Sequence, residues 1–142
     1  MFKPALISIV SILLLSSFQF IPTNSSSWEK IQSVEGVDIY QKQVEVETSE
    51  YHHSYIVFRY VNTTNKAAYL KWKLNIWYND NCRSCDLKSP NEYEMSLALH
   101  PGETIEGTSQ DKDKKLRLFH SDRNNSATQQ LSKVEFKIRS GL

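Results

Sequence analysis

The sequence predicts an all-β fold, an antiparallel β-sandwich of about seven strands. Several stretches alternate apolar and polar residues with a period of two, the pattern of a strand with one buried face. Turn-forming residues separate these stretches at regular intervals, and no stretch shows a convincing period of 3.6 residues. The clearest alternation runs through residues 69–78, which we take as the central strand.

The first residues have the layout of a secretory signal peptide. Lys3 precedes an apolar run at residues 5–15, and a mostly polar stretch follows it. The run is shorter than the roughly 20 residues needed to cross a bilayer, although a retained membrane anchor stays open as an alternative. We assign residues 1–22 to the signal peptide, with the cut between residues 18 and 27, and residues 28–142 to one domain. A secreted or periplasmic protein without stable membrane insertion is therefore expected.

The strand expected near residues 37–46 has apolar residues on both faces. Val37 and Ile39 share one face of an extended chain, whereas Val44 and Val46 share the other. A flat strand would bury one pair and expose the other. We therefore expect a β-bulge or a switch of sheet between residues 40 and 43.

The next two strands are expected to pair with each other. In the strand at residues 51–62 the side chains of Ile56, Phe58 and Tyr60 should face inward. Residues 62–65 are expected to form an Asn-rich turn. The central strand follows this turn, so an antiparallel pair is expected. Its inward side should hold Leu70, Trp72, Leu74, Ile76 and Tyr78.

Shorter strands complete the predicted sandwich. We expect them at residues 92–100, 104–107, 115–120 and 133–139, with a polar loop at residues 79–91. Seven strands with Trp72 on the central one favour an immunoglobulin-like sandwich. The inter-sheet disulfide of antibody domains is absent, because Cys82 and Cys85 are only three residues apart.

Cys82 and Cys85 are the sharpest chemical feature of the sequence. In an exported protein they are expected to form a local disulfide. A thioredoxin-like dithiol needs a following helix, which the sequence does not show, and haem attachment needs a histidine where Asp86 stands. A metal site or free redox thiols remain alternatives, since the chain also contains four histidines.

Charge and motifs exclude several classes of function. Lys3 lies in the predicted leader, which leaves equal numbers of basic and acidic residues in the rest of the chain. This balance argues against nucleic acid or an anionic membrane as the main partner. The sequence has no nucleophile-elbow motif, and its four glycines form no phosphate-binding loop. We therefore expect a protein that is not an enzyme and needs no cofactor or metal.

Four short segments resemble small exported bacterial proteins with immunoglobulin-like folds. The segments are residues 60–64 (YVNTT), 72–79 (WKLNIWYN), 82–85 (CRSC) and 99–104 (LHPGET). Many proteins of that kind have no assigned activity. The resemblance implies an immunoglobulin-like sandwich over about residues 37–139, and it implies no catalytic residues.

Two hypotheses of different classes follow from the sequence. The first is a non-enzymatic binding or structural module that contacts a protein or a glycan through residues 79–90 and Trp77. Tyr69, on the same strand face, and Arg83, in the loop, are further candidate contacts. The second is a small metal-binding or redox protein that uses the two cysteines, and a weaker third is a hydrolase inhibitor that presents a rigid loop.

Overall fold

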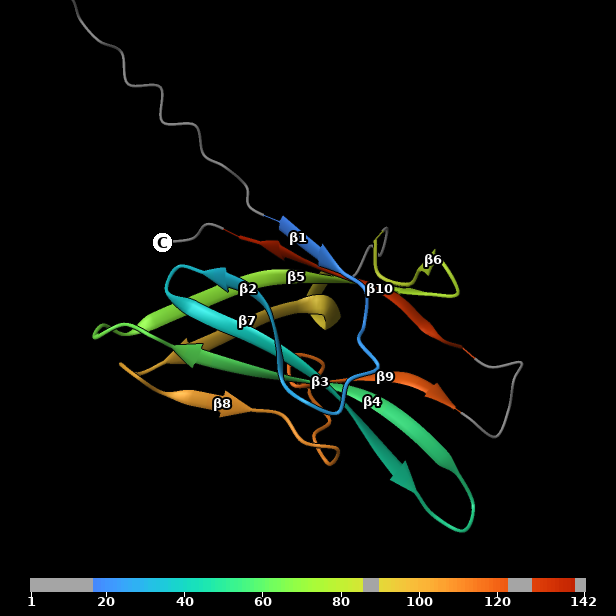
Figure 1. The fold of residues 1–142 in the computed structure, drawn as a ribbon. Coiled ribbons are helices and arrows are strands. Elements are labelled where there is room, and N and C mark those ends of the chain that lie inside the picture. Colours follow the sequence, from blue (N-terminus) through green and yellow to red (C-terminus); the bar gives the residue numbers. More distant parts are fainter. Residues whose placement is uncertain (1–16, 86–89, 123–128, 140–142) are drawn as a thin grey trace, which may run out of the picture.

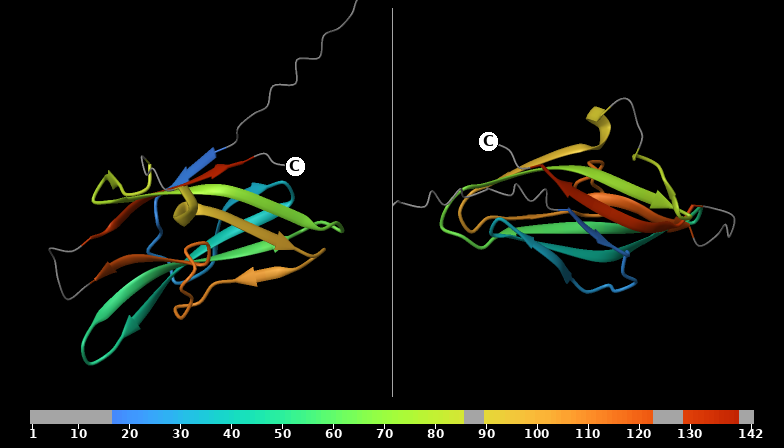
Figure 2. Two further views of the ribbon diagram at one scale, coloured as in Figure 1. Left: turned by 180° about the vertical axis from the view of Figure 1, so that it is seen from behind. Right: turned by 90° about the horizontal axis from the view of Figure 1, so that it is seen from above.

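A computed structural model describes residues 17–85, 90–122 and 129–139 of the chain. Within these ranges the chain forms ten strands and one short 3-10 helix, η1 (Pro90–Tyr93). The strands make two five-stranded antiparallel sheets that pack face to face (Figure 1, Figure 2). They are β1 (Ser17–Phe20), β2 (Glu29–Val34), β3 (Val37–Glu47), β4 (His52–Asn62), β5 (Ala68–Tyr78), β6 (Asn81–Cys82), β7 (Glu94–Leu99), β8 (Thr104–Glu106), β9 (Arg117–Asp122) and β10 (Leu131–Ile138). The predicted all-β antiparallel sandwich is confirmed, with ten described strands in place of about seven.

Sheet A has the strand order β1–β10–β5, and β6 and β7 share the far edge of β5. β7 pairs with the first six residues of β5, and β6 pairs with its last two. Among the described residues the edge of β5 therefore has no strand partner at residues 74–76, between β7 and β6. Ser84, which lies between Cys82 and Cys85, bonds to this part of the edge.

Sheet B has the strand order β2–β3–β4, and β8 and β9 share the far edge of β4. The β3–β4 hairpin is its backbone, with eleven residue pairs in continuous register. Figure 1 shows the tip of this hairpin standing away from the rest of the sandwich. The tip therefore receives less cover from sheet A than the middle of the hairpin does.

Four aromatic side chains fill the space between the two sheets. Phe58, Tyr60, Trp72 and Phe136 are fully buried. The rings of Trp72 and Phe136 stack with centroids 5.3 Å apart, and Phe58 meets Phe136 edge-on at 5.6 Å. Burial of such side chains stabilises a fold by about 1.5–3 kcal/mol each. The apolar residues predicted to face inward on β4, β5 and β10 are all buried, as the alternation indicated.

The expected pairing of the strands at residues 51–62 and 69–78 is wrong. β4 lies in sheet B and β5 in sheet A, so the chain crosses between the sheets at the Asn-rich turn. Asn62 holds this crossing, because its buried side-chain amide donates hydrogen bonds to the carbonyl oxygens of Lys66 (2.7 Å) and His100 (3.0 Å). A period of two identifies the buried face of a strand but not its neighbour.

The bulge expected between residues 40 and 43 is also wrong. The register of β3 against β4 is unbroken, and the irregularity lies in β2, at Ile31. Val44 and Val46 therefore lie on the outer face of sheet B, while Gln41 and Gln43 lie on the inner face. The sequence pattern reflected an apolar patch on the outside of the sandwich rather than a bulge.

β1 falls inside the segment predicted to be a signal peptide. Phe18 packs on Phe136 with ring centroids 5.0 Å apart, and Phe20 packs on Phe58 at 6.1 Å. A cut between residues 18 and 27 would remove part or all of this strand. Within the described ranges no helix is long and apolar enough to cross a membrane.

Candidate ligand-binding site

The turn between β5 and β6 shapes one end of sheet A. Asn79 and Asp80 both have positive φ, 49° and 64°, as in a two-residue type I′ hairpin turn. Asn and Asp adopt this backbone more easily than other residues with a side chain. The polar stretch expected at residues 79–91 therefore begins as a tight hairpin rather than as an open loop.

The start of β10 fixes this turn in place. The Asn79 amide donates to the Gln130 carbonyl oxygen (2.9 Å), and the Gln130 amide donates to Asn79 Oδ1 (3.1 Å). The Asp80 amide donates to Ser132 Oγ at 3.0 Å, and that hydroxyl donates to the Trp77 carbonyl oxygen. These bonds hold the polar side chains of the turn next to β10, which favours a preformed site.

A polar cleft of about 520 Å³ opens beside the turn, and we call it the His120 cleft. Its lining combines side-chain amides, a hydroxyl, a carboxylate and an imidazole with a few apolar groups. The residues are Ile21, Pro22, Asn24, Asn79, Asp80, His120, Gln130, Leu131 and Ser132. They come from the segment after β1, from the β5–β6 turn, from β9 and from the start of β10.

His120 is the buried titratable group of this cleft. Its side chain is only 4% exposed, and its Nδ1 lies 3.0 Å from Ser54 Oγ. Burial lowers the pKa of His120, so the imidazole is neutral at pH 7. Within the described chain Nε2 has no hydrogen-bond partner, which leaves this nitrogen available to a ligand. Ser54 is fully buried, so the Ser54–His120 pair does not present a nucleophile to the cleft.

A second, smaller pocket of about 260 Å³ adjoins the cleft, and we call it the Trp77 pocket. The two hollows share Ile21, Asp80 and Ser132. Lys133 Nζ lies 4.0 Å from the centroid of the Trp77 ring, on the strand next to it. Ile21 stands at the rim with its side chain 78% exposed. Together the two hollows form one composite surface with an aromatic part and a polar part.

The three candidate contact residues from the sequence do not lie together. Trp77 is half-buried and lines its pocket, as described above. Tyr69 is 48% exposed on the same face of β5, but eight residues of a strand place it about 26 Å away. The Arg83 guanidinium lies 5.9 Å from the Tyr78 ring, and Tyr78 points to the opposite face of β5 from Trp77. Only Trp77 therefore belongs to the composite surface.

Cys82 and Cys85 form a disulfide with Cα atoms 5.7 Å apart, and the loop that it closes docks on the edge of β5. The hydroxyl of Ser84 occupies the gap in that edge. It accepts a hydrogen bond from the Ile76 amide and donates one to the Leu74 carbonyl oxygen, both at 3.0 Å. A metal site or a pair of redox thiols would need Cys82 and Cys85 as free thiols, and in this structure both are joined in the disulfide. The disulfide instead shapes a loop whose serine replaces a missing strand partner.

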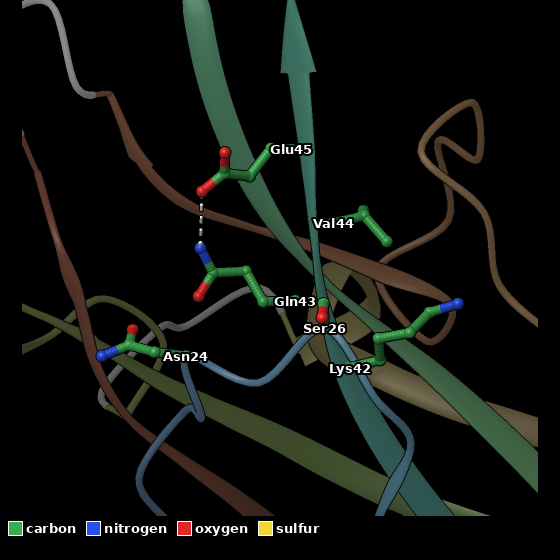
Figure 3. Close-up of a pocket in the computed structure, with 6 residues that line it drawn as sticks. All are labelled: Asn24, Ser26, Lys42, Gln43, Val44 and Glu45. Carbon is green, nitrogen blue, oxygen red and sulfur yellow. Dashed lines mark hydrogen bonds between the residues drawn. The ribbon is translucent and has the colours of Figure 1, made fainter.

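A third hollow, of about 450 Å³, lies along the edge of β3 (Figure 3). Its lining comes from four consecutive residues of β3 and from two residues of the incoming chain, Asn24 and Ser26. Among the described residues its lining contains no aromatic side chain, and its buried polar atom without a hydrogen-bond partner is Gln43 Oε1. We therefore regard the composite surface at the end of sheet A as the better candidate.

The sequence did not single out most residues of the composite surface. His120, Gln130 and Ser132 lie on strands or loops far from Trp77 in the chain, and nothing local marks them. The pair Asn79-Asp80 did carry a signal, because adjacent residues of these types between two strands indicate a type I′ turn. Lys133 alternates on β10 as an ordinary solvent-facing residue does.

Comparison with known proteins does not assign a family. No protein-family model matches the sequence, and no curated protein matches it. A crystal structure of a DUF1425 family member from Shewanella sp. pv-4 matches over 87% of this chain and 97% of its own, with a TM-score of 0.37 and 12% sequence identity. A likeness at this level carries no conclusion about function.

Proposed function

We propose that this protein is an exported, non-enzymatic sandwich module that binds a glycan through the composite surface. The observation that carries the proposal is the junction of an aromatic ring, Trp77, with the polar His120 cleft in one continuous surface. An aromatic ring beside convergent amide and carboxylate groups is a suitable arrangement for a sugar. The aromatic ring packs against the C–H face of the sugar, and the polar side chains form hydrogen bonds with the sugar hydroxyls.

The size and charge of the cleft support a neutral, hydroxyl-rich ligand. Its volume of about 520 Å³ falls within the range of small-molecule sites, which is roughly 300–1,000 Å³. The described residues of its lining include no lysine or arginine, and its imidazole is neutral at pH 7 because burial lowers the pKa of His120. A phosphate or another strong anion would find no cation in the cleft itself.

A protein partner at the same surface is the second candidate. Ile21 is a large apolar side chain that is 78% exposed at the rim of both hollows. Exposed apolar residues of this kind often become buried in protein interfaces. The binding experiment below separates this partner class from a glycan.

Export is supported by two independent features. The first is the order of charged, apolar and polar residues before residue 28. The second is the disulfide, since such bonds persist in oxidising compartments and are rare in the cytosol. A secreted or periplasmic location follows from the proposal.

The immunoglobulin-like assignment is supported by the order of the strands. β4 and β9 are neighbours in one sheet, and β5 and β10 are neighbours in the other, as strands B, E, C and F are in immunoglobulin sandwiches. Trp72 lies on β5, in the place of the buried tryptophan of strand C. The Phe58–Phe136 contact joins β4 to β10 where antibody domains have their disulfide.

The test is a binding screen of the purified exported protein against a panel of neutral and acidic glycans. Calorimetry of the best ligand with the Trp77→Ala variant should show at least about a tenfold loss of affinity, or 1.4 kcal/mol. The Tyr69→Ala variant is the matched control, because it removes an exposed aromatic from the same sheet face far from the site, and it should bind normally. The ligand should also be recovered uncleaved by mass spectrometry after prolonged incubation.

Three outcomes would overturn the proposal. Binding that is unchanged by Trp77→Ala would remove the composite surface as the site. A screen without any glycan ligand, together with a protein partner lost on the same substitution, would assign the surface to the second candidate. Cleavage of the bound glycan would show that the module is an enzyme.

A further inference from the structure

The β3–β4 hairpin reverses its polarity toward its tip. In the first part of β3 the inner positions are apolar, with Val37 and Ile39 fully buried. From Gln41 onward the inner positions of β3 become polar, and from Val44 onward its outer positions become apolar. Figure 3 shows this directly, with Gln43 and Glu45 on one side of the strand and Val44 on the other. The tip of the hairpin is therefore built to bury its outer face.

The outer face at the tip carries a continuous group of rings. Val44 lies opposite Tyr55, and Tyr55 lies opposite Phe119 on β9. His53 joins the group, because its ring meets Phe119 at 5.4 Å and stacks on Tyr51 at 4.4 Å. We call this group the hairpin patch, and it consists of Val44, Val46, Tyr51, His53, Tyr55 and Phe119. Its members are half-buried or exposed.

Charges of opposite sign border the hairpin patch at its two ends along the strands. Lys42 and Arg117 lie in one row across the sheet, and the Arg117 guanidinium lies 4.3 Å from the centroid of the Tyr55 ring. At the other end Asp122 lies opposite His53 on β9, with Oδ2 3.6 Å from Nε2. The patch is thus basic at one end, aromatic in the middle and acidic at the other end.

We propose that the hairpin patch is the contact face of a homodimer, with two copies packed face to face. The twofold axis lies in the interface and runs across the strands, so the basic row of each copy meets the Asp122 end of the other. A surface that carries both signs at opposite ends is complementary to itself in this arrangement, which is the condition for an isologous interface. An axis along the strands would place like charges together, which is costly.

The same features indicate that the patch binds another protein chain. An apolar patch rimmed by charges marks a protein contact, and aromatic residues with an arginine at the margin are typical of its energetic centre. The patch spans three strands only, β3, β4 and β9, so we expect a contact at the small end of the range for protein interfaces. The dimer is therefore weak, and it forms at micromolar rather than nanomolar concentration. The patch lies on the outer face of sheet B and shares no residue with the composite surface, so this inference does not depend on the proposed function.

Sedimentation velocity of the full exported chain, from about 5 to about 500 μM, tests the dimer. The wild-type protein should shift from monomer to dimer across this range. Val44→Asp places a carboxylate in the middle of the patch and should keep the protein monomeric throughout, while circular dichroism confirms that it folds. Tyr69→Ala, which removes an exposed aromatic from sheet A, is the matched control and should dimerise like the wild type.

A charge exchange tests the orientation. The axis across the strands brings β9 of one copy over β9 of the other, so Arg117→Glu places an acidic group against Asp122 at both ends of the dimer and should weaken association at least about tenfold. Adding Asp122→Lys in the same chain restores opposite charges and should recover most of the loss, which a merely local disturbance would not allow. A wild-type protein that stays monomeric over the whole range, or a dimer that Val44→Asp leaves intact, would overturn the proposal.

Discussion

Replacing Ser84 with alanine should release the cysteine loop, residues 82–85, from the edge of β5. Ser84 is fully buried, and its hydroxyl is the partner of two main-chain groups of β5 that no strand reaches. Without it the Ile76 amide and the Leu74 carbonyl lose these hydrogen bonds. The neighbouring bond from the Arg83 amide to the Ile76 carbonyl oxygen, 2.8 Å long, would remain.

The structure sets the size of the effect. A buried polar group left without a partner costs about 1–3 kcal/mol, and two such groups would cost about 2–6 kcal/mol. For comparison, the loop-entropy model assigns about 2 kcal/mol to a disulfide that closes a loop of four residues. A single hydroxyl should therefore matter at least as much for stability as the Cys82–Cys85 bond.

Urea unfolding followed by circular dichroism measures this loss, and hydrogen exchange of the Ile76 amide locates it. Ser96→Ala is the matched control, because Ser96 is exposed on β7 and its substitution should change the unfolding free energy very little. A loss for Ser84→Ala of less than about 0.5 kcal/mol, the range of an ordinary surface substitution, would refute the reasoning. An Ile76 amide that exchanges no faster in the variant would do the same.

Three further predictions follow from the core and from the chain ends. Phe136→Ala should lower the unfolding free energy by about 3–5 kcal/mol in the same urea titration, because it opens a cavity among four aromatic neighbours. A loss below about 1 kcal/mol would contradict the described core. Burial raises the pKa of Tyr78 to about 12, above the ordinary value of about 10, so the unfolded chain loses this proton first. The stability due to the neutral phenol should be complete below pH 10 and be lost between about pH 10 and pH 12, and Tyr78→Phe should show a shallower decline. In the export that we propose, the mature protein should retain residues 17–20, because β1 is part of sheet A. Intact-mass measurement of the natural N-terminus checks this, and a chain that begins after Phe20 would contradict it.

The sequence predicted which face of each strand is buried better than it predicted which strands pair with each other. Alternation in β5 and β10 identified the inward side chains correctly, because burial between two layers imposes that rhythm directly. It did not show that β4 and β5 lie in different sheets, since both arrangements bury the same residues. It also could not distinguish a bulge in β3 from an apolar outer face, because Val44 and Val46 give the same pattern in either case.

The composite surface was only partly visible in the sequence. Trp77 stood out as an aromatic residue on the polar side of its strand, and the structure places it at one of the two hollows. His120 and Ser132 reach the same region only because β9 and β10 end beside the β5–β6 turn. Their proximity depends on long-range strand pairing, which has no local signature. Ser84 was likewise invisible, because its role depends on a gap between two other strands.

The pairing of β1 with β10 has a consequence for the order of events in the cell. Ser17 and Phe20 find their partners only at Lys137 and Val134, close to the other end of the chain. Sheet A therefore cannot close until β10 has been synthesised, and contacts of such long range form slowly. In the export that we propose, this late closure would keep the chain extended and able to pass through a narrow channel until β10 has been made.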